Sequence, residues 1–278
     1  MSASTTVQMA RRPRAFVGVA GPGAEDYLQR MLSNDVAALA PGESCDALLL
    51  TPKARVIAPL RVARRGAEDF LLLTEPELGE IVRAELLRFR FAARAQIELE
   101  EHSSYLVFGP GAEAPPGALA VPNLDYGVPA VEVVGAAEPP EAARFSDDEL
   151  EELRIRAGTP RYGREIDDRI LPAEAGLVER AVSFTKGCYP GQEPIARLHY
   201  RGHVNRGLRL LRLDGDDLPG YDAPVVSGGK DVGRVTSAVR AAQGVLALAY
   251  VRAEVPAEAE LQVGSARARA LDFPSPRP

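Results

Sequence analysis

The chain has 278 residues, of which 46% are hydrophobic and 26% charged, and its formal net charge is -6 at pH 7. This composition is typical of a globular protein with one large domain or two smaller ones, and it excludes a disordered or fibrous chain. The chain has 2 cysteines, which exclude a disulfide scaffold and a zinc framework. No stretch approaches the roughly 18 apolar residues of a membrane-spanning helix. We expect a cytoplasmic protein without a membrane contact.

The first half of the chain mixes helices and strands. Residues before Glu25 contain basic and small polar residues but no acid, and we expect them to form a disordered tail. Apolar residues at helical spacing predict a turn followed by a helix over residues 21–36 and a second helix over residues 76–91. Short apolar runs predict strands over residues 45–50, 56–62, 70–74, 96–99 and 105–108. Because strict strand-helix-strand alternation is lacking, we predict an α+β fold class.

The second half changes from Pro-, Ala- and Gly-rich to all-β. Residues 109–145 contain one predicted strand, 130–134. Ser146 and Glu149 form a capping-box pattern, which predicts a helix that runs to about Ala157 and is ended by Gly158. Six further strands indicate a small closed barrel or sandwich, over residues 208–213, 223–226, 232–240, 245–251, 261–263 and 266–271. We place a domain boundary between residues 203 and 204.

The most informative stretch is residues 186–193, KGCYPGQE, which crowds a thiol, an ammonium, a phenol and a carboxylate together. A free thiol has a pKa of roughly 8.5, and a nearby cation favours the reactive thiolate. We therefore expect Lys186 to activate Cys188 from the same face of an extended segment. Gly187 and Gly191 permit close approach of a ligand. The alternative is a small buried Cys188 followed by an ordinary Pro-Gly turn.

Cations cluster around this stretch, against the single acid Glu193. Clustered cations concentrate anions, so we expect an anionic ligand or partner near the stretch; the alternative is a solvated basic face. The cluster consists of Arg180, Lys186, Arg197, His199, Arg201, His203, Arg206 and Arg209. The second cysteine, Cys45, is expected to be a structural residue in a strand.

KGCYPGQE is followed along the chain by Ala196-Arg197 and Arg201-Gly202. Together these residues resemble the signature of the YgfZ type of folate-binding proteins, relatives of the glycine-cleavage T-protein. Weaker matching segments occur in the same order along most of the chain. They are LQ at 28–29, SNDV at 33–36, LTPK at 50–53, LRIRAG at 153–158, PAEAGL at 172–177 and GRVTS at 233–237. The resemblance implies a T-protein-like folate-binding domain over residues 1–203 and a C-terminal β-barrel domain over residues 204–278.

The resemblance also implies a function. Such proteins bind tetrahydrofolate or a folate derivative and act in the assembly or repair of iron–sulfur clusters, including those of tRNA-modifying enzymes. The implied partners are folate and iron–sulfur enzymes or their assembly proteins. We expect an accessory protein without multiple-turnover activity, or a folate-dependent aminomethyltransferase if it has one.

The resemblance assigns residues to roles. Cys188 is the implied functional thiol, with Lys186 and Tyr189 as its neighbours. A pterin presents N–H donors that a carboxylate can accept, and a glutamyl tail presents carboxylates that an arginine can bind. The implied folate-binding residues are Glu132, Arg154, Gly187, Gly191, Gln192, Glu193 and Arg197. For Arg154 the alternative is an ion pair on a helix surface. The chain departs from the family pattern at Ala54, often Gly, at Pro190 and Pro194, more often aliphatic, and at Arg156, an acid in the pattern.

Three other functions compete with this interpretation. Aminomethyl transfer requires a general acid beside the folate, and the T-protein has an aspartate in the segment that matches residues 52–57, where this chain has none. Metal binding by Cys188, His199 and His203 requires a further ligand, and we expect no metal. An RNA-binding role for the basic stretch lacks interleaved aromatic residues, and the chain is acidic overall, so we expect no direct nucleic-acid binding.

Overall fold

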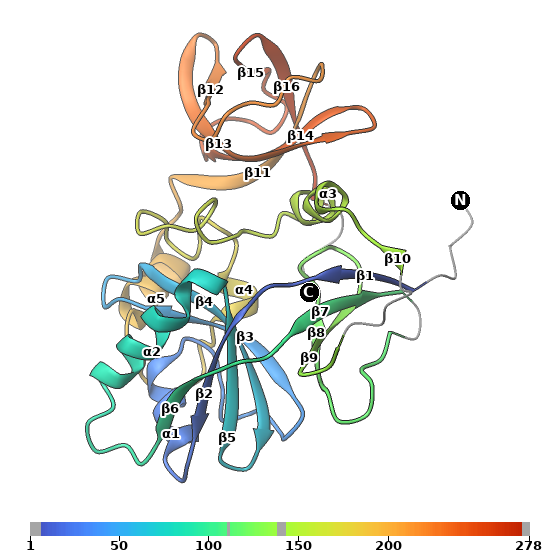
Figure 1. Ribbon diagram of the computed structural model, residues 1–278. Coiled ribbons are helices and arrows are strands. Elements are labelled where there is room, and N and C mark those ends of the chain that lie inside the picture. Colours follow the sequence, from blue (N-terminus) through green and yellow to red (C-terminus); the bar gives the residue numbers. More distant parts are fainter. Residues whose placement is uncertain (1–6, 110–111, 138–142, 274–278) are drawn as a thin grey trace. The chain divides into compact units, whose positions relative to one another are not determined.

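The computed structural model describes residues 7–109, 112–137 and 143–273. The chain packs as two compact units. Unit 1 comprises Met1–Asn123, Pro129–Arg144 and Leu177–Arg197, and unit 2 comprises Leu124–Val128, Phe145–Gly176 and Leu198–Pro278. Figure 1 labels their helices and strands. The predicted domain boundary between residues 203 and 204 stays a prediction.

The first sheet of unit 1 has the strand order β3-β4-β5-β2-β6, and all its pairs are antiparallel. Its strands are β2 (Ala15–Ala20), β3 (Ser44–Leu50), β4 (Val56–Gly66), β5 (Asp69–Thr74) and β6 (Gln96–Glu100). The expected disordered tail is wrong for the described residues, because β2 is an interior strand. Val17 and Val19 are fully buried, and Phe16 faces the opposite side of the sheet and is also buried. Residues 1–6 lie outside the described part of the chain.

The second sheet of unit 1 has the order β10-β1-β7-β9-β8. Its strands are β1 (Gln8–Arg11), β7 (Ser104–Phe108), β8 (Leu119–Asn123), β9 (Ala130–Val134) and β10 (Ala143–Arg144). Val121 and Val134 of this sheet share a buried cluster with Phe16, Leu71 and Leu73 of the first sheet. The two sheets therefore pack against each other within unit 1.

Helices cover the rest of unit 1. The η1 turn (Pro76–Leu78) leads into α2 (Gly79–Arg88), which packs on β2, β4 and β6, and α4 (Val178–Ala181) packs on β3. Within residues 21–36, predicted as a turn followed by a helix, the helix α1 spans Ala24–Met31. It ends there because Leu32 forms a bridge with Leu49 and the backbone N–H of Ser33 bonds to Leu48.

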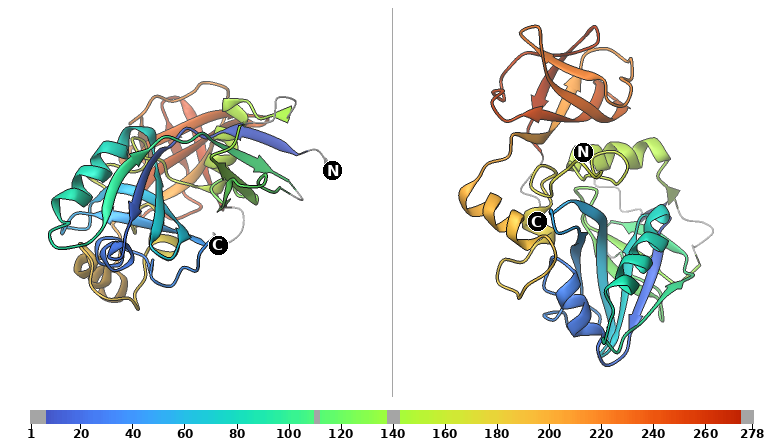
Figure 2. Two further views of the ribbon diagram at one scale, coloured as in Figure 1. Left: turned by 60° about the horizontal axis from the view of Figure 1, so that its bottom comes forward. Right: turned by 90° about the vertical axis from the view of Figure 1, so that its left-hand side faces the viewer.

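Unit 2 contains a closed barrel, drawn in orange and red in Figure 2. The strand order of the barrel is β11-β14-β13-β12-β15-β16. Its strands are β11 (Arg206–Leu213), β12 (Pro224–Ser227), β13 (Lys230–Ala241), β14 (Gly244–Arg252), β15 (Leu261–Val263) and β16 (Ala266–Leu271). Outside the barrel, α3 (Asp147–Ala157) places Ile155 in a buried cluster with Leu210, Val239 and Leu248. The predicted α+β class with a C-terminal barrel is confirmed.

The two ends of α3 confirm the capping box and the glycine stop that the sequence predicts. The Ser146 hydroxyl accepts a hydrogen bond from the backbone N–H of Glu149, and the Glu149 carboxylate accepts one from the backbone N–H of Ser146. Gly158 ends the helix at φ 66°, a conformation that glycine adopts without a steric cost. Among the residues that the structure describes, no helix is long and apolar enough to cross a membrane.

Candidate functional site

The stretch Lys186–Glu193 connects α4 to α5 (Gln192–Arg201) and is anchored at its first residue. The ammonium of Lys186 donates hydrogen bonds to the backbone carbonyls of Leu32 and Asn34, both at 2.7 Å, and lies 5.3 Å from the centre of the Tyr189 ring. Lys186 is buried, whereas Cys188 is exposed. Asn34 belongs to the SNDV segment, so this segment directly contacts the lysine of the motif.

Lys186 is not a solvated cation beside the Cys188 thiol, because burial changes its pKa. Burial lowers the pKa of Lys186 to about 8, opposed by the nearby charge of Asp35. Burial raises the pKa of the Cys45 thiol, in β3, to about 12, with Asp46 adding to this shift and Lys186 opposing it. The predicted activation of Cys188 by Lys186 stays a prediction.

The two glycines of the stretch have different surroundings. A Cβ at Gly191, where φ is +83°, would lie 2.7 Å from the carbonyl oxygen of Thr51 and 3.1 Å from the Cα of Ala54. A Cβ at Gly187 would meet no heavy atom within 4 Å. The space at Gly191 is therefore filled by the turn between β3 and β4, and the space at Gly187 is open.

That turn also explains one departure from the family pattern. Ala54 is fully buried and has a φ of 57°, in the left-handed region where a Cβ is unfavourable. Glycine, which the resemblance makes the expected residue at this position, adopts this conformation freely. Ala54 adopts it at the expense of local strain.

Tyr189 is a buried residue of the stretch with an unsatisfied polar atom. The residue is 7% exposed, and its hydroxyl has no hydrogen-bond partner among the described residues. Burial raises the pKa of this phenol to about 12, so the hydroxyl is a neutral donor at physiological pH. A buried donor without a partner is costly, and it is a feature that a bound ligand can satisfy.

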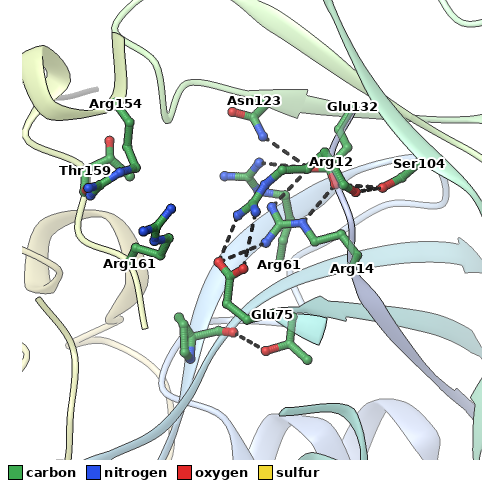
Figure 3. Close-up of polar contacts among 12 residues, drawn as sticks. Arg12, Arg14, Arg61, Glu75, Ser104, Asn123, Glu132, Arg154, Thr159 and Arg161 are labelled. Atoms are coloured by element: carbon green, nitrogen blue, oxygen red, sulfur yellow. Dashed lines mark hydrogen bonds and ion pairs between the residues drawn. The ribbon is translucent and has the colours of Figure 1, made fainter. Parts of the chain in front are cut away.

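A second polar cluster of unit 1 surrounds Glu132 in β9 (Figure 3). Its carboxylate accepts hydrogen bonds from Arg14 at 2.9 and 3.1 Å, from Asn123 at 3.1 Å and from Ser104 at 3.5 Å. Beside it, Arg12 forms two hydrogen bonds with Glu75, at 2.8 and 3.2 Å. Two arginines of the connection between β1 and β2 thus meet two buried carboxylates.

These contacts determine the ionisation state of Glu132, which is fully buried. Burial by itself raises its pKa, but the charge and hydrogen bonds of Arg14, with the charges of Arg12 and Arg61, outweigh burial and hold the pKa below its ordinary value. A carboxylate has about four acceptor sites, and Arg14 and Asn123 occupy three of them, whereas the single proton of the Ser104 hydroxyl is directed to the carbonyl of Arg12. A pterin N–H would have to use the remaining site or replace one of these donors, so the predicted folate contact of Glu132 stays a prediction.

A continuous chain of polar contacts connects the Glu132 cluster with the motif stretch. Arg61 lies 3.9 Å from the Glu132 carboxylate and donates to Asp46 at 2.9 Å. The other Asp46 oxygen accepts from Arg180 at 2.8 Å, and its backbone carbonyl accepts from Asn34, whose own carbonyl binds Lys186. The structure therefore brings Glu132 and Lys186 into one network.

Arg154, on α3 of unit 2, is committed to internal partners. Its guanidinium donates to Glu151 at 2.7 and 2.9 Å, to Glu165 at 3.0 Å, to Ser237 at 2.8 Å and to the carbonyl of Thr159 at 2.6 Å. Burial opposes its charge, but the two carboxylates raise its pKa. Every N–H donor has a partner, so a folate carboxylate would have to displace one. The folate contact of Arg154 stays a prediction.

The remaining predicted residues lie at the start of α5. Gln192 is half-buried, whereas Glu193 and Arg197 are exposed. The basic stretch is less free than its sequence suggests, since Arg180 pairs with Asp46 and Arg206 with Glu174. His203 lies beyond the end of α5, so it does not share a helical face with His199. Within residues 7–109, 112–137 and 143–273, no group of three or more metal-ligating side chains occurs.

The sequence analysis missed Arg14, Asp46 and Arg61, which hold the network together. Arg14 lay in the supposed tail, and a buried charge gives no signal in a single sequence until its partner is known. Arg61 stands among apolar residues in β4, and this position could have indicated a buried charge.

The fold is T-protein-like. It matches the crystal structure of glycine cleavage system aminomethyltransferase T from Bartonella henselae with a TM-score of 0.82, over 96% of this chain and 85% of that chain, at 20% sequence identity. At this identity the match shows the fold alone. No protein-family model matches the chain.

Sequence relatives are more specific. The chain is 29% identical over 286 residues to the tRNA-modifying protein YgfZ of Edwardsiella ictaluri, covering 89% of this chain and 85% of the relative. It is 40% identical over 90 residues to the mitochondrial iron-sulfur cluster assembly factor IBA57 of Mus musculus, covering 30% of this chain and 24% of that protein. The predicted resemblance is confirmed: the chain is a relative of YgfZ-type proteins and aminomethyltransferases.

Proposed function

We propose that this chain is a tetrahydrofolate-binding accessory protein of cytoplasmic iron–sulfur metabolism. It supports iron–sulfur enzymes, including those that modify tRNA, and Cys188 supplies the functional thiol. The printed names of the relatives support the iron–sulfur and tRNA-modification part of this proposal. Folate binding is supported by the fold match to an aminomethyltransferase.

The observation that carries the proposal is the exposed thiol of Cys188 between two fixed residues. Lys186 is held by two carbonyl bonds, and the backbone at Gly191 fits against the β3–β4 turn. A reactive thiol needs both access and a defined position, and this arrangement supplies both. A merely structural cysteine would be expected in the interior.

Tyr189 and Gly187 fit a bound folate, whereas Glu132 and Arg154 already have internal hydrogen-bond partners. The unpaired hydroxyl of Tyr189 would donate to a folate heteroatom, and the open space at Gly187 admits a ligand against the backbone. Glu132 and Arg154 would take part by exchanging an internal partner. Gln192, Glu193 and Arg197 would contribute from the start of α5. When bound, tetrahydrofolate would supply a carrier for one-carbon units.

Calorimetric titration of the purified full-length chain with tetrahydrofolate tests the proposal. We expect saturable binding by the wild type and by Arg269→Gln, a control that removes an exposed cation of β16. A chain that acts only through a metal or an RNA would show no saturable folate binding. That outcome would contradict the proposal.

Aminomethyl transfer remains a second candidate, because the fold match is to an aminomethyltransferase. The turn at residues 51–55 carries Lys53 and Arg55 and no carboxylate, so the general acid for this reaction would have to come from elsewhere. An assay for methylenetetrahydrofolate formation from an aminomethylated carrier protein distinguishes the two. We expect no turnover.

A further inference from the structure

Residues 88–94, RFRFAAR, form a loop after α2 in which cations and aromatic residues alternate; we call it the Arg-Phe loop. Phe91 is 88% exposed and Phe89 is 42% exposed. The backbone of Phe91 has a φ of 35°, which is rare for a bulky residue. Two exposed large aromatic side chains, one of them at a strained backbone position, are a feature of binding surfaces.

The Arg-Phe loop is held in place by its own backbone and by α1. The N–H of Ala93 donates to the carbonyl of Arg90 at 2.7 Å, and the N–H of Gly23 donates to the carbonyl of Arg94 at 3.1 Å. A Cβ at Gly21 or Gly23 would come within 3 Å of the Arg94 backbone, so these glycines permit the close approach. The loop is therefore preorganised, which lowers the entropic cost of binding.

A cavity of about 440 Å³ lies between the Arg-Phe loop and α1. Its lining includes Tyr27, Arg30, Phe89, Phe91 and Arg94. This volume lies in the range of natural ligand pockets, and the aromatic lining is typical of them.

The cavity carries excess positive charge. The guanidinium of Arg30 pairs with Asp26 at 2.8 Å, and Asp26 is the one acid of the lining. Among the described residues, Arg90 and Arg94 have no carboxylate partner; Arg90 donates only to the carbonyl of Ala95, at 3.4 Å. Two guanidinium groups are thus available to an anion.

We propose that the Arg-Phe loop binds single-stranded RNA. A nucleotide combines a flat aromatic base with a phosphate, and the loop offers Phe91 for the base and Arg90 and Arg94 for phosphates. Aromatic stacking accepts any base, and arginine forks match phosphate oxygens. The basic stretch from Arg180 to Arg209 lacks such interleaved aromatics, so this site departs from the expectation that the chain contacts no nucleic acid.

This proposal goes beyond the folate-binding function and does not depend on it. An acidic protein segment would also match the charge of the loop, but it would leave the exposed face of the Phe91 ring without the stacking partner that a base supplies. The two occupants differ in a measurable way, because only RNA binding depends on the flat face of an aromatic residue.

Fluorescence anisotropy with a labelled oligouridine of about 12 nucleotides tests the proposal on the full-length chain. We expect Phe91→Ala to weaken binding at least about fivefold, and Phe91→Tyr to retain it. Arg90→Gln with Arg94→Gln should lower the slope of log affinity against log salt concentration by about 0.7 for each lost phosphate contact. Arg269→Gln, on β16, removes one exposed cation as a matched control and should change neither affinity nor slope beyond the effect of overall charge.

Four outcomes would overturn the proposal. The first is a wild type without saturable RNA binding. The second is equal binding by wild type and Phe91→Ala, with both folded by circular dichroism. The third is binding of a labelled polyglutamate peptide that the loop variants abolish, with no binding of RNA. Duplex RNA bound as tightly as the single strand would likewise contradict stacking of unpaired bases on the loop.

Discussion

The guanidinium of Arg14 forms two hydrogen bonds with the carboxylate of Glu132, at 2.9 and 3.1 Å, in the interior of unit 1. The two side chains are 7% and 0% exposed and come from segments 118 residues apart. A buried pair of this kind stabilises the fold only while both charges are present. Glu132, which the family resemblance assigns to folate binding, therefore also stabilises the fold of unit 1.

Replacing Glu132 by Gln should destabilise the chain by about 3–5 kcal/mol, because the buried Arg14 would lose its hydrogen-bonded counter-charge and keep only the Glu75 carboxylate, 3.7 Å away. Urea unfolding measures this loss. Glu98→Gln is a matched control on the exposed side of β6 and should change the free energy of unfolding by less than about 0.5 kcal/mol. An equal effect of the two substitutions would show that the buried pair does not stabilise the fold.

The same variant has a defined pH dependence. The pKa of Glu132 in the fold lies below its ordinary value of 4.5, so the unfolded chain takes up this proton first as pH falls. The stabilisation by Glu132 is complete above the unfolded pKa and is lost as pH falls through the folded pKa. The stability difference between wild type and Glu132→Gln should therefore shrink below about pH 4.5. A constant difference down to pH 3 would contradict the ionic role of Glu132.

The two glycines of the motif stretch should respond differently to alanine. Gly191→Ala should cost about 2 kcal/mol or more of stability, because φ is +83° and the new Cβ would collide with Thr51. Gly187→Ala should leave stability within about 0.5 kcal/mol of the wild type and weaken tetrahydrofolate binding. Thermal unfolding and folate titration separate the two effects. Unchanged folate affinity in Gly187→Ala would argue against a ligand at that position.

Removing the hydroxyl of Tyr189 should affect the ligand and not the fold. Because this hydroxyl has no partner, Tyr189→Phe should unfold at the same urea concentration as the wild type or a higher one, yet bind tetrahydrofolate about fivefold more weakly. Tyr250→Phe is the contrasting control: its hydroxyl donates to the carbonyl of Glu165 at 2.8 Å, and its loss should cost about 1 kcal/mol of stability. Wild-type folate affinity in Tyr189→Phe would remove the hydroxyl from the proposed site.

The two cysteines should differ in reactivity. Cys188 is exposed, whereas Cys45 is half-buried and its thiol pKa is raised to about 12. Since the thiolate is the reactive form, iodoacetamide near neutral pH should modify Cys188 at least about tenfold faster than Cys45. Mass spectrometry of tryptic peptides measures both rates. In Cys188→Ser only the slow reaction should remain, and rapid modification of Cys45 would contradict the environment described for it.

Much of the fold was predictable because it rests on local signals. The strand at β9 and the cap of α3 follow from apolar runs and from the Ser146–Glu149 pair, and the barrel strands follow from regular turns. The β2 strand was missed because arginines precede it, and α5 because Pro194 stands within its first turn. The tie between Lys186 and the Leu32–Asn34 backbone is a long-range contact, so spacing alone could not show that the motif lysine is buried away from solvent.

Complementation of a bacterial strain that lacks its own YgfZ relative tests the central claim most directly. Wild type and Cys188→Ala would be expressed at equal levels, with Cys45→Ala as the matched control, and the activity of an iron–sulfur tRNA-modifying enzyme would be scored. Our account predicts rescue by the wild type and by Cys45→Ala, and loss of rescue by Cys188→Ala. Equal rescue by Cys188→Ala would contradict the assigned role of the thiol.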